Sequence, residues 1–79
     1  MEGITNIEKT REDIERCREI VKTTLDAELT EEMLEALTLE VMDTSLFIGG
    51  DFANQNIQDL ALQYKETGAV ERFKKNFGG

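Results

Sequence analysis

The side chains best able to do chemistry in this sequence are carboxylates, and they are concentrated in its middle. Seven acidic residues and no basic one lie between Asp26 and Asp43. Grouped carboxylates could bind a hard divalent cation, but a calcium loop needs ligands at alternating positions and a glycine at the sixth, and the spacing here matches no such loop. We therefore predict no metal site. The same charges would suit a basic partner surface.

Enzymatic chemistry is not expected. The sequence contains no histidine, the residue most often used as a general base and as a metal ligand. Its one cysteine, Cys17, falls on the apolar side of an expected helix, and we interpret it as a small core residue rather than a reactive thiol. We predict a protein that is not an enzyme, with no catalytic residues and no cofactor.

Five of the seven acidic residues lie in an expected helix over residues 31–48, and Asp26 and Glu28 precede it. Thr30 is a suitable N-cap, and Gly49-Gly50 can adopt the left-handed backbone at which helices end. Apolar residues at helical spacing form a core-facing stripe, and carboxylates occupy the other side. We predict that a partner binds through five of these acidic residues: Glu28, Glu31, Glu32, Glu35 and Asp43.

Three apolar residues also lie on the acidic side of this helix: Leu39, Met42 and Leu46. A stripe that faces a single neighbouring helix cannot bury them, so something else must cover them. One alternative is that the aromatic side chains after residue 60 fold over them within the chain. The other is that they form the contact of a symmetric homodimer.

The remaining patterns are helical as well. Thr5-Asn6-Ile7-Glu8 has the form of a capping box at the start of a first helix, and Asp51 or Asn54 can cap a third. The short connection between the first two helices predicts an antiparallel hairpin. We predict an all-α fold in which the whole chain, residues 1–79, is one compact domain. The four expected helices cover residues 6–25, 31–48, 54–66 and 69–77.

The expected helix over 31–48 ends in the stretch Phe47-Ile48-Gly49-Gly50-Asp51. This stretch is similar to the Gly-Gly-Asp/His-Ser motif of the peptidyl carrier proteins, a family whose serine carries phosphopantetheine. Phe52 stands at the position of that serine here. The resemblance therefore lacks the residue on which the family's function depends.

A second stretch resembles a helix-turn-helix DNA-binding motif. Ile57 to Tyr64, followed by a glycine and the basic segment 69–77, looks like its two helices, but the glycine comes seven residues after Ala61 where the motif expects four. The basic residues of this segment are Arg72, Lys74 and Lys75. The acidic first half of the chain would repel a DNA duplex, so DNA binding is the least favoured of the three functions proposed for this sequence.

Charge and size shape the expected function. The net charge is −8, and residues 1–43 contain 13 acidic and 5 basic residues. This imbalance argues against direct binding to nucleic acids or anionic membranes. In size and charge the chain resembles phage- and mobile-element-type inhibitors that occupy a nucleic-acid-binding surface on a basic target.

We therefore expect an acidic protein–protein interaction module. The competing interpretation is a homo-oligomeric structural or regulatory protein. The sequence shows no secretion signal and no apolar run long enough to span a membrane, so we expect a cytoplasmic location.

Overall fold

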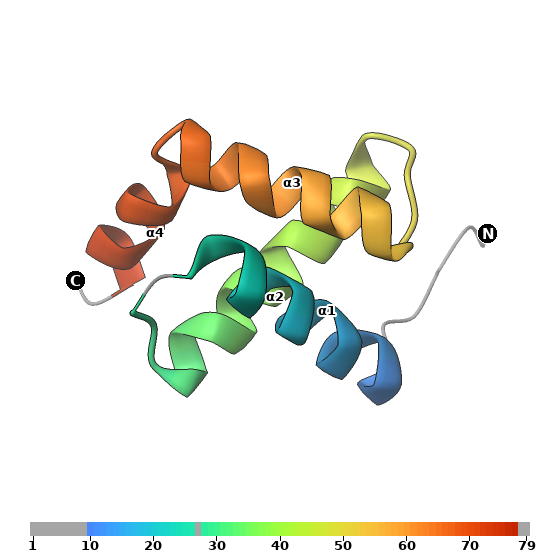
Figure 1. The fold of residues 1–79 in the computed structure, drawn as a ribbon, viewed down its shortest axis with the longest axis horizontal. Coiled ribbons are helices and arrows are strands. Elements are labelled where there is room, and N and C mark those ends of the chain that lie inside the picture. The colour runs from blue at the N-terminus through green and yellow to red at the C-terminus, as the bar shows by residue number, and fades with distance from the viewer. Residues whose placement is uncertain (1–9, 27, 78–79) are drawn as a thin grey trace, which may run out of the picture.

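The computed structural model describes residues 10–26 and 28–77, which form four helices in chain order (Figure 1). The helices are α1 (Arg11–Leu25), α2 (Glu31–Phe47), α3 (Asn54–Glu66) and α4 (Ala69–Phe77). These residues contain no strand. The all-α fold is confirmed, and the predicted bounds of the last three helices agree with the observed ones to within one residue.

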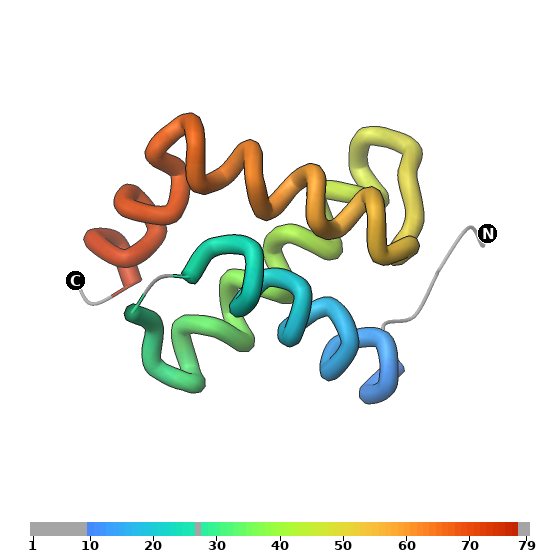
Figure 2. Tube along the Cα trace, viewed as in Figure 1, coloured from blue at the N-terminus to red at the C-terminus, as the bar shows by residue number. Residues whose placement is uncertain are grey.

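Helix α2 contacts each of the other three helices. In Figure 1, α1 and α3 lie side by side and α2 crosses behind them, and the tube in Figure 2 shows the same crossing. The short helix α4 contacts α3 and α2. Helices α1 and α2 are consecutive and in contact, as expected of a hairpin, but they cross rather than lie antiparallel. Because α2 is apolar on most sides, it needs neighbours in several directions, and this arrangement supplies them.

Threonine side chains cap the first two helices. The hydroxyl oxygens of Thr10 and Thr30 accept hydrogen bonds from the backbone amides of Asp13 and Met33, each at 3.1 Å. The cap at Thr30 was predicted, and it satisfies an amide that has no partner inside the helix. For the first helix, the predicted start at residue 6 is wrong because Thr10 is extended and α1 begins at Arg11. The proposed cap at Thr5 lies outside the described residues.

Two glycines end α2, as predicted. Gly49 adopts a φ of 87°, and the amides of Gly49 and Gly50 donate to the carbonyl oxygens of Leu46 and Ser45 at 3.0 and 2.7 Å. This pair of bonds is a Schellman motif, in which the left-handed residue is usually glycine. A Cβ at Gly50 would lie 3.0 Å from the Ser45 hydroxyl oxygen. Glycine is therefore favoured at position 49 by its left-handed backbone conformation, and at position 50 because a side chain there would crowd Ser45.

The turn before α3 is organised by Asp51. Its carboxylate accepts hydrogen bonds from the backbone amide of Ala53 at 3.0 Å and from the side-chain amide of Asn56 at 2.7 Å. The N-cap position is occupied by Ala53, which makes no side-chain cap bond. The prediction that Asp51 or Asn54 caps α3 is corrected accordingly: Asp51 holds the preceding turn, and Asn54 is the first residue of the helix.

The buried apolar residues form one cluster that draws on all four helices. Cys17, Val21, Leu37, Val41 and Ile57 are fully buried in it. The side chain of Phe52 enters the same cluster from the loop after α2, although the polar sequence around it predicted only a loop. Arg16 holds this loop against α1 because its guanidinium donates to the Phe52 carbonyl oxygen at 2.7 Å and to the Asn54 side chain.

The three apolar residues on the acidic side of α2 are covered to different extents. Met42 is fully buried within the chain, and Leu39 and Leu46 are partly buried against the core. Met42 therefore offers no surface to a second copy, which removes it from the predicted homodimer contact. Tyr64 and Phe73 pack against the same core, in agreement with the alternative in which the chain covers these residues itself. No helix in the described part of the chain is long and apolar enough to cross a membrane.

Candidate functional site: an acidic and an aromatic hollow beside Phe77

The first half of α2 borders a shallow hollow of about 470 Å³. Its lining residues come from α1, α2 and the last residue of α4: Arg18, Glu31, Glu32, Glu35, Ala36, Leu39 and Phe77. We name it the acidic hollow. Leu39 is partly buried and the Phe77 ring is 44% exposed, so apolar surface lies beside the three carboxylates.

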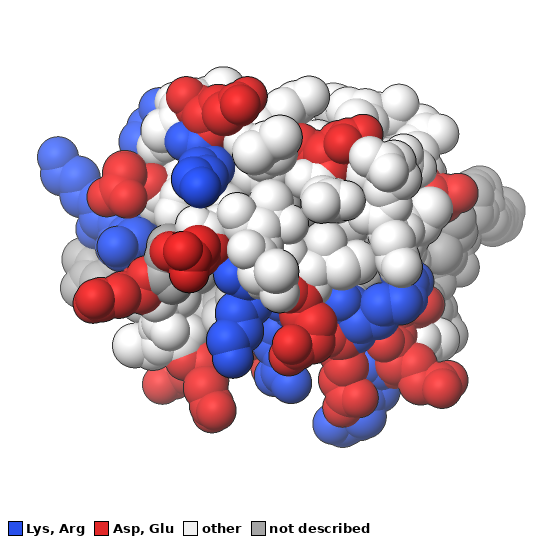
Figure 3. Space-filling model, viewed as in Figure 1, with Lys and Arg blue, Asp and Glu red and all other residues white. Residues whose placement is uncertain are grey.

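The negative charge around this hollow has little local compensation. Helix α2 contains no lysine or arginine, and among the described residues Arg18 is the one basic side chain that lines the hollow. Over α1 the situation differs, because acidic and basic side chains alternate there (Figure 3). Asp13 and Arg16, three residues apart on α1, form a salt bridge at 3.1 Å. The surface of α2 therefore produces a stronger negative electrostatic potential than the surface of α1 does.

The structure brings together three of the five residues predicted to bind a partner. Glu31, Glu32 and Glu35 are exposed and line the acidic hollow. Glu28 and Asp43 are exposed but do not line it. Asp43 lies eight residues after Glu35, which is roughly 12 Å along the helix axis. Leu39, which was predicted to lie at an oligomer contact, lines the same hollow as the glutamates.

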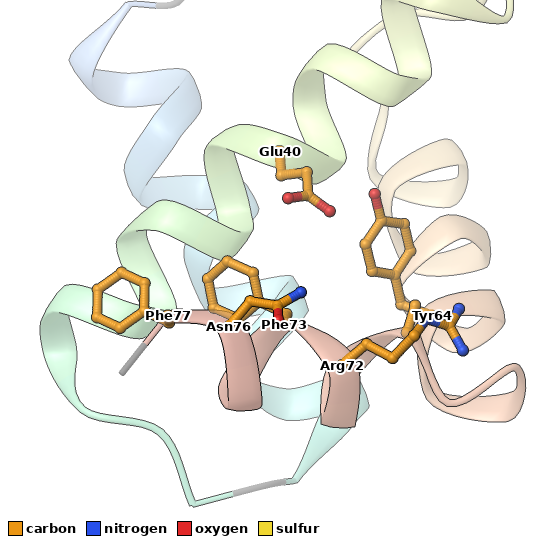
Figure 4. Close-up of a pocket in the computed structure, with 7 residues that line it drawn as sticks. Glu40, Tyr64, Arg72, Phe73, Asn76 and Phe77 are labelled. Atoms are coloured by element: carbon orange, nitrogen blue, oxygen red, sulfur yellow. The ribbon is translucent and has the colours of Figure 1, made fainter. Parts of the chain in front are cut away.

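A second hollow, of about 410 Å³, is also lined by Phe77. Its lining residues come from α2, α3 and α4: Glu40, Tyr64, Ala69, Arg72, Phe73, Asn76 and Phe77. We name it the aromatic hollow. Figure 4 shows the Glu40 carboxylate directed toward the Tyr64 hydroxyl, with the rings of Phe73 and Phe77 to one side. These two rings are tilted by 31° with centroids 5.5 Å apart.

The polar groups of the aromatic hollow are arranged around Tyr64. Its hydroxyl lies 3.0 Å from the Thr44 hydroxyl. Burial raises the pKa of Tyr64, and the nearby Glu40 carboxylate raises it further, although the bond to Thr44 opposes this. Arg72 extends away from Glu40, and its guanidinium donates to the Thr67 carbonyl oxygen at 3.4 Å. The phenol is neutral at neutral pH and can donate or accept a hydrogen bond.

Sequence reasoning missed this second hollow. Glu40 stood among the acidic residues of α2 but was not singled out, although it faces Tyr64 in the structure. Phe73 and Phe77 are four residues apart, a spacing at which side chains on one helix meet. That spacing could have suggested a paired aromatic surface. No pattern in the sequence near Glu40 indicated that it would lie close to these aromatic side chains.

The remaining candidate chemistry is accounted for by packing. Burial raises the pKa of the Cys17 thiol and leaves it fully enclosed in the core. Phe52, at the position of the carrier-protein serine, is buried, and the nearby Ser45 is also buried and donates to the Asp51 carbonyl oxygen at 2.6 Å. Among the described residues, no three carboxylate or thiol side chains converge on a point where a metal ion could bind.

Comparison with protein-family models, with curated proteins and with solved structures finds no match for this chain. The two hollows and their charge are therefore the features of the molecule that bear on its function.

Proposed function

We propose that this protein is a non-enzymatic interaction module that docks its α2 surface on a basic protein, in the manner of an inhibitor that occupies a nucleic-acid-binding surface. The observation that carries the proposal is the acidic hollow. Glu31, Glu32 and Glu35 are exposed around the apolar side chains of Leu39 and Phe77, and Arg18 is the one cation that lines the hollow in the part of the chain that the structure describes.

The two parts of this surface have different physical roles in the proposal. Exposed carboxylates attract a basic partner over roughly one Debye length, about 8 Å at physiological ionic strength, and so raise the association rate. Apolar side chains at the centre of a contact contribute more to its lifetime, because they are removed from water when the partner binds. Phe77 fits the second role, since it is exposed and lines both hollows.

In this proposal, the carboxylates of the protein take the place of nucleic-acid phosphates on the partner. A protein that binds nucleic acid presents lysine and arginine at positions that match phosphates, and a row of carboxylates can occupy the same positions. Binding would then compete with nucleic acid for one surface. Direct binding of this protein to nucleic acid is not part of the proposal, because the chain has a net charge of −8.

Affinity capture from the native host tests the proposal. The bait is the full chain, and bound proteins are eluted by raising salt from about 0.01 M to about 1 M, which shortens the Debye length from about 30 Å to about 3 Å. We expect a basic nucleic-acid-binding protein to be retained at low salt and released at high salt. Recovery of the bait alone would contradict the proposal.

Two variants make this capture specific. In the first, Glu28, Glu31, Glu32 and Glu35 are changed to glutamine, and we expect it to lose the partner. In the matched control, four exposed glutamates outside α2, namely Glu12, Glu19, Glu66 and Glu71, are changed to glutamine. The control alters the net charge equally, so it should retain the partner if the location of the charge matters. Equal capture by both variants would overturn the assignment to α2.

A homo-oligomer is the second candidate, and one observation favours it. Phe47 is 90% exposed and Ile48 is 64% exposed at the end of α2. Large apolar side chains in adjacent exposed positions are suited to a contact between copies. The predicted contact residues Leu39 and Leu46 are only partly buried, whereas Met42 has no exposed surface to contribute.

A further inference from the structure

The aromatic hollow combines aromatic rings with an anionic group. Phe73, Phe77 and Tyr64 line it together with the Glu40 carboxylate. The face of an aromatic ring carries partial negative charge and attracts cations, and a carboxylate beside the rings adds to that attraction. This set of side chains is suited to an organic cation whose carbon atoms contact the rings while its charge approaches Glu40.

The Glu40 carboxylate interacts with the Tyr64 hydroxyl and has further acceptor positions for such a contact. Among the residues that the structure describes, no lysine or arginine forms a salt bridge with it. Arg72 also lines the hollow, but its guanidinium is directed toward the turn between α3 and α4, where it reaches the Thr67 carbonyl oxygen. Within residues 10–26 and 28–77, the charge of Glu40 is therefore not paired with a basic side chain.

We propose that the aromatic hollow binds the ammonium group of a lysine side chain on the basic partner. That this lysine belongs to a protein rests on the proposed function, in which the partner presents a basic surface. The four-carbon stem of the lysine lies against Phe73 and Phe77, and the ammonium group reaches Glu40 and Tyr64.

Lysine suits this hollow better than arginine does. An ammonium group is a compact charge with three donors in different directions, whereas guanidinium is a planar fork that matches a single carboxylate edge or phosphate. Oxygen acceptors here come from three separate side chains on three helices: Glu40, Tyr64 and Asn76. The volume of about 410 Å³ is near the lower end for ligand pockets, in keeping with one side chain as the occupant.

The position of the aromatic hollow relative to the acidic hollow supports a shared partner. Phe77 lines both, so the two hollows adjoin across its ring. A basic surface attracted by Glu31, Glu32 and Glu35 is thereby held next to Glu40. One lysine could then enter the aromatic hollow while neighbouring basic residues face the acidic one.

The inference can be tested on the protein alone, with n-butylammonium chloride as the probe. We expect backbone amide signals of Glu40, Tyr64, Phe73 and Phe77 to shift in ¹H–¹⁵N spectra as the probe is added at constant ionic strength. The affinity should be in the millimolar range, as is usual for a ligand of so few atoms. The neutral analogue 1-pentanol should bind at least about tenfold more weakly, since it lacks the charge that Glu40 and the rings recognise.

Three variants locate the binding site. Glu40→Gln should weaken n-butylammonium binding by about tenfold or more, and Phe77→Leu should weaken it as well because the ring is lost while apolar volume is kept. Glu66→Gln, at an exposed carboxylate of α3 outside the hollow, is the matched control and should bind as the wild type does. Phe77 is already 44% exposed, so Phe77→Leu is expected to fold.

Several results would overturn the inference. They are equal binding of 1-pentanol, shifts that are unchanged in Glu40→Gln, and tighter binding of n-butylguanidinium than of n-butylammonium. Failure here is distinguishable from failure of the proposed function. The variant with four glutamines at positions 28, 31, 32 and 35 retains Glu40, so it should bind n-butylammonium whether or not it captures a partner.

Discussion

The burial of Met42 offers a direct test of how α2 is covered. Its side chain has no exposed surface, and Met→Ala changes at such positions cost about 2–5 kcal/mol through lost contacts and the cavity left behind. For 79 residues, a typical folding free energy is about 4–12 kcal/mol at roughly 0.05–0.15 kcal/mol per residue. We therefore expect Met42→Ala to be folded but markedly less stable, and Met42→Glu to be unfolded because an unpaired charge would be buried.

Thermal unfolding followed by circular dichroism measures both effects. Each kcal/mol corresponds to a change of about 4–8 °C in Tm for a domain of this size, so Met42→Ala should lower Tm by at least about 8 °C. Leu62→Ala is the control, because Leu62 is 43% exposed on α3 and its loss should cost about 0.5 kcal/mol. A Met42→Glu variant that keeps the wild-type spectrum and Tm would refute the burial of Met42 within the chain and would return it to a contact between copies.

Two further predictions concern the turn before α3 and the exposed end of α2. Hydrogen bonds from the Ala53 amide and the Asn56 side chain lower the pKa of Asp51, so the stability that its carboxylate contributes is present above its unfolded pKa and is lost as pH falls. In urea titrations between about pH 5 and pH 3, we expect the free energy of unfolding to fall less for Asp51→Asn than for the wild type. An equal fall in the two proteins would contradict this. At the end of α2, Phe47 and Ile48 alone provide less area than the roughly 1,200–2,000 Å² of a stable interface, so light scattering should give the 9.0 kDa monomer. A doubled mass that Phe47→Ser returns to the monomer value would establish the homo-oligomer instead.

Local signals account for what could be predicted of the fold. The bounds of α2 follow from the cap at Thr30 and the glycines after Ile48, and both signals act within a few residues of the helix ends. The start of α1 was harder to predict because both Thr5 and Thr10 precede apolar residues at helical spacing. Local pattern does not choose between two such caps.

Features that depend on distant contacts could not be predicted. Phe52 is buried because Arg16, 36 residues earlier, holds its loop against α1, while its own neighbours are polar. The glutamates of the acidic hollow were predicted from charge alone, since they are close together on one helix. The aromatic hollow was not predicted, because it forms only when α4 packs on α2 and brings Phe73 opposite Glu40.

The most direct measurement of the central claim is the association rate with the captured basic partner as a function of salt. Stopped-flow or surface-based kinetics would compare the wild type, the variant with glutamine at positions 28, 31, 32 and 35, and the control with glutamine at positions 12, 19, 66 and 71. We expect the wild-type rate to fall steeply as salt rises, the variant with glutamine at positions 28, 31, 32 and 35 to associate severalfold more slowly with a shallower salt dependence, and the control to resemble the wild type. Identical rates and salt dependence in all three proteins would contradict a functional acidic surface on α2.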